Sequence, residues 1–217
     1  MRLLRPSLAM LGAFVIGAGA LYTLAVTGLA RLAFPERAAG SLAYAAGAGP
    51  DAEAGEPIGS LLLGQAFSRP DRFHGRPSCC GYDPAAGAAT QLGPTSAVLA
   101  KAVAERRAAS VAENPGAGEP PAELLLASGS GLDPHISPVA ALYQVPRIAA
   151  ALRAKAAAAV ASGAPSAATA DMDEDALRAL VSSLTEGRAG GILGEPRVNV
   201  LDLNLELERR LAAAPGK

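Results

Sequence analysis

The most pronounced feature of the hydrophobic pattern is an uninterrupted apolar run near the N-terminus. Residues 6–30 carry no charged side chain. As a helix, this run spans roughly 38 Å, which exceeds the roughly 30 Å hydrocarbon core of a bilayer. A cleavable signal peptide is the alternative, but its apolar region has only about 7–15 residues, and the cleavage-like Ala43-Tyr44-Ala45 lies well beyond the run. We therefore predict a transmembrane helix, with residues 1–34 as the anchor.

The charges that flank this run predict its orientation. Arg2 and Arg5 precede it without an acidic residue, whereas Arg31, Glu36 and Arg37 follow it as a mixed group. Positive charge is enriched on the cytoplasmic side of membrane spans. The N-terminus is therefore predicted in the cytoplasm, and the C-terminal part in the periplasm, of a single-pass protein of the inner membrane.

Small residues recur along one face of the predicted span. Ala9, Ala13 and Gly17 are spaced four apart, which places them on the same side of a helix. Small side chains allow a second transmembrane helix to approach closely. We predict a packing face for a partner helix here, although alanine and glycine are also common throughout the chain.

The pattern beyond the anchor predicts one further domain. Residues 35–57 are rich in alanine and glycine and are interpreted as a linker, and residues 58–217 as a single periplasmic domain. Strand and helix signals alternate through that domain. The predicted fold class is α+β, with one N-terminal transmembrane helix followed by this α/β-type domain.

Helices are predicted where a capping residue precedes an apolar stripe. Thr95 or Ser96 begins a helix that reaches about residue 112. Asp173 begins a helix in which leucine and valine recur at i, i+3, i+4 and i+7, and residues 201–211 form a last one.

Proline, glycine and β-branched residues determine the remaining elements. Ser137 and Pro138 begin a helix that Pro146 interrupts, so a short helix and then a longer one to about residue 161 are expected. Residues 59–67 and the alternation around 198–200 predict strands, and residues 162–170 a polar loop.

Composition excludes several classes of function. The net charge is −1, whereas nucleic-acid binding needs concentrated positive charge. Cys79 and Cys80 are adjacent, which disfavours a relaxed disulfide and excludes a CxxC zinc site. His74 and His135 are the two histidines, and neither lies in a cluster with metal-ligand spacing. We predict no metal site, no catalytic residue and no resident cofactor.

Three segments carry a distinctive local sequence. The first is Phe67–Asp83, with Arg76-Pro77-Ser78 and Tyr82-Asp83, followed by LGPT at 92–95. The second reads ASGSGLDPHISP at 127–138, and the third reads LGEPRVNVLDLN at 193–204. In this order, behind one N-terminal span, the three motifs resemble the KdpC family over nearly the whole chain.

The resemblance implies a non-catalytic, membrane-anchored subunit of a high-affinity, ATP-driven potassium importer. Its partners would be a channel-like potassium-translocating subunit, a P-type ATPase catalytic subunit and a small membrane subunit. The chain agrees with an accessory role, because it lacks the DKTGT motif of P-type ATPases. The resemblance also implies assistance to ATP binding by the catalytic subunit, so ATP would concern this chain through the complex. The subunit would assemble and stabilise that complex.

The second motif is the candidate docking loop for a partner subunit. Its residues combine conformational freedom at glycine, fixed φ at proline and hydrogen-bonding side chains. The candidate residues are Ser128, Gly129, Ser130, Gly131, Asp133, His135 and Ser137.

Two other interpretations of this loop, and one of the whole chain, remain open. It could be a rigid, self-bonded loop without a partner. It could belong to an anchored periplasmic hydrolase that uses Ser130 and His135, although residues so close along one chain seldom form a triad. The chain could also be an assembly protein of another membrane complex.

Overall fold

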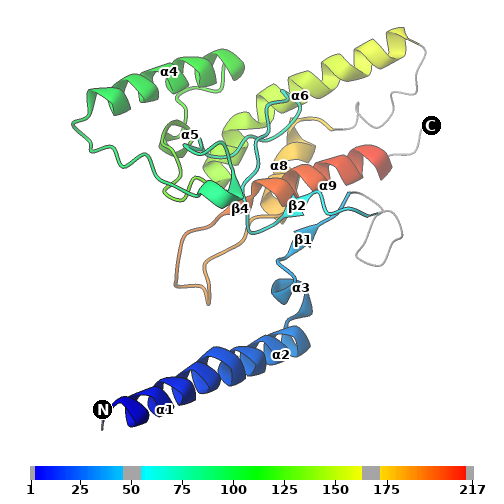
Figure 1. Cartoon of the computed structure of the whole chain (residues 1–217). Coiled ribbons are helices and arrows are strands. Elements are labelled where there is room, and N and C mark those ends of the chain that lie inside the picture. Colours follow the sequence, from blue (N-terminus) through cyan, green and yellow to red (C-terminus); the bar gives the residue numbers. More distant parts are fainter. Residues whose placement is uncertain (1–2, 46–54, 163–171, 214–217) are drawn as a thin grey trace. The chain divides into compact units, whose positions relative to one another are not determined.

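The computed structural model describes residues 3–45, 55–162 and 172–213. The chain divides into two compact units, Met1–Ala43 and Tyr44–Lys217, and each is described by itself. Figure 1 shows both. The predicted boundaries at residues 34 and 57 remain predictions, and the predicted loop at 162–170 lies almost entirely outside the described residues.

The first unit is dominated by one long apolar helix. Leu4–Ala33 is continuous over 30 residues, and its most apolar 18-residue window has a mean hydropathy of 1.9 and no buried residue. It consists of α1 (Leu4–Phe14), a π-helical segment η1 (Val15–Tyr22) and α2 (Thr23–Ala33). This helix is long and apolar enough to cross a membrane. The short α3 (Pro35–Ala38) and β1 (Leu42–Ala43) follow it.

The second unit is mostly helical, with strands of only two residues. Its elements in chain order are β2 (Gly59–Ser60), η2 (Pro84–Ala86), α4 (Ala97–Glu113), α5 (Ala122–Leu125), β3 (His135–Ile136), α6 (Pro138–Ala161), α8 (Glu174–Ser183), β4 (Val198–Asn199) and α9 (Val200–Ala213). The helical content exceeds what the predicted α+β class suggested. The prediction of a strand over 59–67 is wrong beyond residue 60, where the chain turns.

The core forms where α6, α8 and α9 pack together, as Figure 1 shows. Leu177, Leu180 and Val181 of α8 are buried, as their helical spacing predicted. They contact buried aliphatic side chains of α6 and α9, including Ile148, Leu152, Leu203 and Leu207. The burial of apolar surface in this cluster is the main stabilising contribution of the fold.

Helices α4, α6 and α8 begin at the capping residues that the sequence predicted. The hydroxyl oxygens of Ser96 and Ser137 accept hydrogen bonds from the backbone N–H groups of Leu99 and Ala140 at 3.4 and 3.2 Å. Asp173 accepts one from the N–H of Ala176 at 2.8 Å. Each cap pairs a donor that would otherwise be unpaired in the first turn.

The predicted break at Pro146 is wrong, because α6 continues through it. Proline removes one helical hydrogen bond, the one that would reach the carbonyl group of Leu142. Leu142 is exposed, so water can pair with that carbonyl. Val145 and Ile148 on either side are fully buried, and their packing stabilises the helix across the proline.

A short antiparallel pair connects two of the sequence motifs. Strand β3 pairs with β4, with His135 opposite Asn199 and Ile136 opposite Val198. The backbone N–H of Val200 donates to the carbonyl oxygen of Pro134 at 2.9 Å. The predicted strand at 198–200 thus ends at residue 199, where α9 begins. This pairing brings the 127–138 loop against the 193–204 motif.

Candidate functional site

The three sequence motifs meet at one groove of about 310 Å³. The first motif contributes Arg76, the second contributes Asp133 and His135–Ser137, and the third contributes Glu195–Arg197. Glu123 of α5 completes the lining. Segments that lie more than 100 residues apart along the chain therefore form a single polar surface.

Asp133 lies at the centre of this groove. One of its carboxylate oxygens accepts the backbone N–H of His135 at 3.0 Å and lies 3.5 Å from His135 Nδ1. The other oxygen lies 3.3 Å from a terminal nitrogen of Arg76. The hydrogen bond from His135, together with the charge of Arg76, holds the pKa of Asp133 below its ordinary value. The carboxylate is therefore ionised at neutral pH, and its hydrogen bond to the N–H of His135 orders the 133–135 turn.

Arg76 is the group in the groove with spare hydrogen-bonding capacity. Its Nε is buried and has no hydrogen-bond partner among the described residues. A buried, unpaired donor is costly, so the Arg76 side chain is incompletely satisfied in the isolated chain. Arginine is also over-represented in recognition surfaces that meet carboxylate groups.

Ser137 connects the groove to two helices. Besides capping α6, its hydroxyl group donates to the carboxylate of Glu123. Its backbone N–H lies 3.1 Å from both carboxylate oxygens of Glu123. Ser137 therefore has a structural role in positioning α5 and α6.

The first half of the docking loop packs against the 77–88 segment. The N–H of Ser128 donates to the carbonyl of Pro77 at 2.9 Å, and the hydroxyl of Ser78 donates to the carbonyl of Gly131 at 2.7 Å. Gly131 has φ +70°, and an added Cβ atom would lie 2.6 Å from Cys80 Sγ. Glycine is required at residue 131 for both reasons.

The loop residues thus divide into two groups. Asp133, His135 and Ser137 line the groove. Ser128, Ser130 and Gly131 bond within the loop or to the 77–88 segment. Gly129 has open space at its Cβ position, so no close approach requires a glycine there. The docking role of these residues stays a prediction.

The hydrolase interpretation lacks the necessary geometry. The hydroxyl oxygen of Ser130 lies 3.2 Å from that of Ser128 and accepts the N–H of Leu132 at 3.1 Å. The side chain of His135 faces Asp133 instead. A catalytic serine needs its base within hydrogen-bonding distance, and here the two side chains bond to other residues.

The predicted packing face of the long helix coincides in part with a surface hollow. Ala13 and Gly17, with Phe14, Ala18 and Tyr22, line an apolar depression of about 440 Å³. Ala9 lies outside that lining. A role for the three small residues in helix packing stays a prediction.

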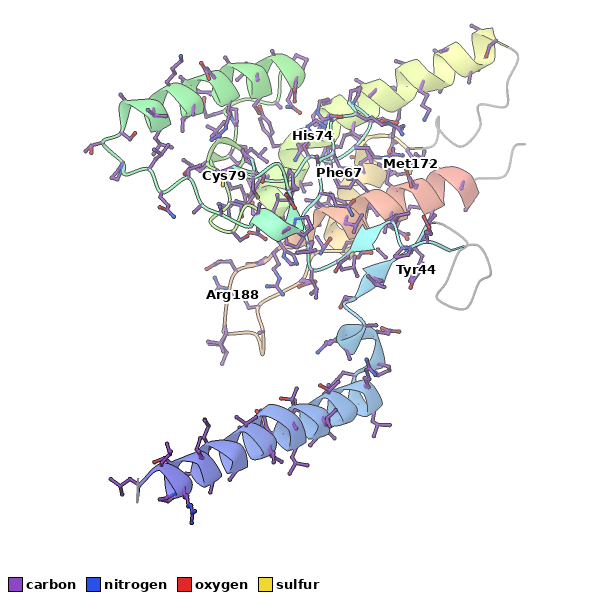
Figure 2. The ribbon with its side chains drawn as sticks, in the orientation of Figure 1. Tyr44, Phe67, His74, Cys79, Met172 and Arg188 are labelled. Atoms are coloured by element: carbon purple, nitrogen blue, oxygen red, sulfur yellow. The ribbon has the colours of Figure 1, made fainter. Side chains whose placement is uncertain are left out.

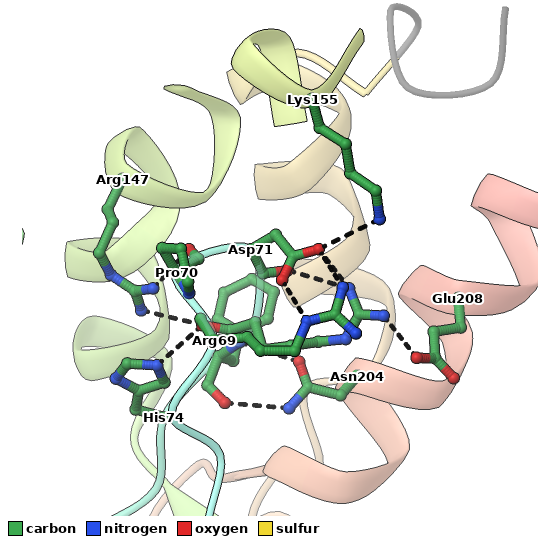
Figure 3. Close-up of polar contacts among 10 residues, drawn as sticks. Arg69, Pro70, Asp71, His74, Arg147, Lys155, Asn204 and Glu208 are labelled. Carbon is green, nitrogen blue, oxygen red and sulfur yellow. Dashed lines mark hydrogen bonds and ion pairs between the residues drawn. The ribbon is translucent and has the colours of Figure 1, made fainter. Parts of the chain in front are cut away.

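A buried polar network, which the sequence analysis missed, holds the segment at 69–74 (Figure 3). Arg147 donates to the carbonyl oxygens of Pro70 and Arg72 at 2.6 and 3.0 Å. Asn204 pairs with both the N–H and the carbonyl of Phe73 at 2.9 Å. Side chains from α6 and α9 thereby satisfy backbone groups in a buried segment that has no regular structure.

Charged groups surround the same segment. Asp71 lies 3.4 Å from Arg72 and 3.5 Å from Lys155, and Arg69 donates to it. Burial opposes the ionised form of Asp71, but these cations outweigh it and hold its pKa below the ordinary value. Arg72 also pairs with Glu208 of α9. A signal for the network existed in the sequence, because Gln144 and Arg147 interrupt the apolar stripe of α6.

His74 beside this network also has a lowered pKa. Burial, and then the charge of Arg147, lower it, whereas the hydrogen bond to the carbonyl of Arg69 and the charge of Glu113, 3.7 Å away, oppose the shift. The His74 ring lies 3.0 Å from the carbonyl of Arg69 and lines a cavity of about 170 Å³ beside α4. The unfolded chain therefore takes up a proton at a higher pH than the folded chain.

This difference predicts a loss of stability on mild acidification. The contribution of neutral His74 to the free energy of unfolding is fully present above its unfolded-state pKa of about 6.5. It is lost as the pH falls toward the lower pKa that His74 has in the folded chain. We expect the Tm of the full chain in detergent to fall between pH 7.5 and 5.5, by roughly 2–4 °C for each kcal/mol lost. His74→Gln, which can still donate to Arg69, should flatten this dependence. An unchanged slope in the variant would refute the assignment.

Among the described residues, no group of three or more His, Cys, Asp or Glu side chains is placed to hold a metal ion. Both cysteines are free thiols. The groove presents acidic and basic side chains, and the buried Nε of Arg76 has no partner among the described residues.

Comparison with known proteins finds relatives that match nearly the whole chain. The family model "KdpC: K+-transporting ATPase, c chain" matches residues 4–209. The chain is 46% identical to the potassium-transporting ATPase KdpC subunit of Methylorubrum populi, over 95% of this chain and 98% of that protein. It is 43% identical to the one of Rhodospirillum rubrum, over 99% of both chains. The KdpC subunit of Gemmatimonas aurantiaca is 41% identical over 100% of this chain and 97% of that protein. With matches this long and this similar, the chain belongs to the KdpC family.

Proposed function

We propose that the chain is the membrane-anchored, non-catalytic subunit of a potassium-importing ATPase complex, and that its domain docks onto the other subunits through the groove. Family membership supports the complex, since the family is the c chain of the K+-transporting ATPase. The observation that carries the docking role is the convergence of the three distinctive motifs on one groove.

The proposed partners are the channel-like potassium-translocating subunit, the P-type ATPase catalytic subunit and the small membrane subunit. The long apolar helix would anchor the chain in the inner membrane, with the face at Ala9, Ala13 and Gly17 packed on a helix of one of them. A groove that presents Asp133 and Glu195 beside Arg76 and Arg197 suits a polar partner surface with charges of both signs.

The proposed topology places the N-terminus in the cytoplasm and the domain in the periplasm. Arg2 and Arg5 support this orientation. ATP is hydrolysed on the cytoplasmic side, so the domain would influence ATP binding only through the complex. We propose that the domain caps and stabilises the channel-like subunit from outside.

A copurification experiment tests the groove. His135→Ala in the full chain should lower the amount of the other ATPase subunits retained in detergent by about tenfold or more, equivalent to about 1.4 kcal/mol. The matched control is His74→Gln, which changes the other histidine in a separate cavity and should retain the subunits as the wild type does. Equal retention by His135→Ala and the wild type would refute the groove.

A second variant changes an exposed side chain. The side chain of Glu195 is 81% exposed and lines the groove. Glu195→Arg reverses a charge on the docking surface and removes the exposed ion pair with Arg188, which contributes at most about 1 kcal/mol, so it should lower retention with little change in Tm. Full retention with this variant would contradict the proposal independently of His135.

A further inference from the structure

A rigid hairpin projects from the second unit between α8 and β4 (Figure 1). Its arms pair at Glu186 with Arg197 and at Ala189 with Leu193. The backbone N–H of Glu186 donates to the carbonyl of Arg197 at 2.8 Å, and the return bond is 3.1 Å. Ion pairs across the arms join Arg197 to Glu186 at 2.8 Å and Arg188 to Glu195 at 3.1 Å. We call residues 186–197 the hairpin.

The tip of the hairpin exposes two adjacent aliphatic side chains. Ile192 is 80% exposed and Leu193 is 72% exposed. Gly190, Gly191 and Gly194 flank them with positive φ, and no atom lies within 4 Å of their Cβ positions. Figure 2 shows the hairpin, with Arg188 labelled, extending away from the packed side chains. Among the described residues, nothing covers the tip.

Exposed apolar groups held on an ordered turn are typical of interaction sites. The paired arms order the backbone before binding, so little conformational entropy is lost when the tip is buried. The glycines leave the two side chains without neighbours, which suits insertion into a pocket. In the sequence analysis, only residues 193–197 of this hairpin belonged to a motif.

The features of the hairpin favour a protein pocket over a lipid surface. Its four charges, at Glu186, Arg188, Glu195 and Arg197, sum to zero and pair with one another. It carries no aromatic side chain, whereas membrane-interface anchors rely on Trp, Tyr, Lys and Arg. The hairpin is also continuous with the groove, because Glu195, Pro196 and Arg197 belong to both.

We propose that Ile192 and Leu193 form an apolar anchor that inserts into a pocket of another subunit of the K+-transporting ATPase. This inference rests on the proposed function. The groove contributes polar contacts at the rim, and the tip contributes the buried aliphatic centre that dominates the affinity of many interfaces.

Copurification of the full chain with the other ATPase subunits in detergent tests the anchor. Ile192→Asp should lower retention roughly tenfold to thirtyfold, because a carboxylate would enter an apolar pocket. The matched control is Val160→Asp, at a side chain that is 66% exposed at the end of α6, and it should retain the subunits as the wild type does. Equal retention by both variants would overturn the anchor while leaving the proposed function intact. Failure of the wild type to retain the subunits would overturn both.

Photo-crosslinking identifies what the tip touches. A photoreactive amino acid in place of Ile192, irradiated in membranes, should form an adduct with one of the other ATPase subunits, identified by mass spectrometry. An adduct with lipid alone, or with none of those subunits, would overturn the proposal.

Discussion

Arg147→Met is expected to lower the free energy of unfolding by about 3–5 kcal/mol, the largest effect of any single change considered. The guanidinium of Arg147 is buried and donates to Pro70, Arg72, Asn114 and Gln144 at 2.6–3.1 Å. Methionine fills a similar volume but removes the hydrogen bond to all four acceptors, of which Gln144 Oε1 keeps the N–H of His74. Burial also lowers the pKa of Arg147, yet arginine stays charged at neutral pH, so the four acceptors are what compensate for its desolvation.

The measurement is thermal unfolding of the full chain in detergent, followed by circular dichroism. A loss of 3–5 kcal/mol corresponds to a fall in Tm of roughly 6–20 °C. Arg153→Met is the matched control, since Arg153 lies on the exposed side of the same helix and should change stability by no more than about 0.5 kcal/mol. Similar Tm values for the two variants would show that the network does not stabilise the domain.

Asn204→Leu is expected to cost about 2–4 kcal/mol. The amide of Asn204 accepts from the N–H of Phe73 and donates to its carbonyl, both at 2.9 Å. Leucine has a similar size, so packing is preserved while two buried backbone groups lose their partner. Phe73 itself is fully buried in the core, so loosening its backbone also weakens the core.

Urea unfolding measures this cost directly. Asn204→Leu should lower the midpoint with little change in the slope, because the area exposed on unfolding is nearly unchanged. Arg209→Leu serves as the control, because it places a leucine side chain at an exposed position of the same helix, α9. A midpoint for Asn204→Leu equal to that of the control would contradict the role of this amide.

Local signals in the sequence were sufficient for most helices. Ser96, Ser137 and Asp173 cap the helices that they predicted, because a side-chain cap depends on only three or four neighbouring residues. The long apolar helix was equally predictable, since its length and lack of charge are local properties. The failed break at Pro146 had a non-local cause, namely the packing of Val145 and Ile148 in the core.

Strands and buried polar contacts were harder to predict. The apolar run at 59–67 has the composition of a strand, but only Gly59 and Ser60 adopt that conformation. The backbone partners of Arg147 and Asn204 lie 70 or more residues away along the chain, at Pro70, Arg72 and Phe73. Nothing in a single sequence specifies such pairs, although polar residues within an apolar stripe indicate that some pairing exists.

The candidate site was identified in part. Asp133, His135 and Ser137 line the groove, whereas the contributions of Arg76 and Arg197 depend on tertiary contacts that the sequence analysis did not foresee. The pairing of His135 with Asn199 brings the second motif to the third. Long-range pairing of this kind connects segments that local patterns treat separately.

Hydrogen–deuterium exchange, compared between the isolated full chain and the assembled ATPase in the same detergent, tests the central claim most directly. The account predicts that exchange slows in the complex at residues 131–137 and 186–197, which carry the groove and the hairpin. Unchanged exchange in both segments, with protection confined to other surfaces such as α4, would contradict it.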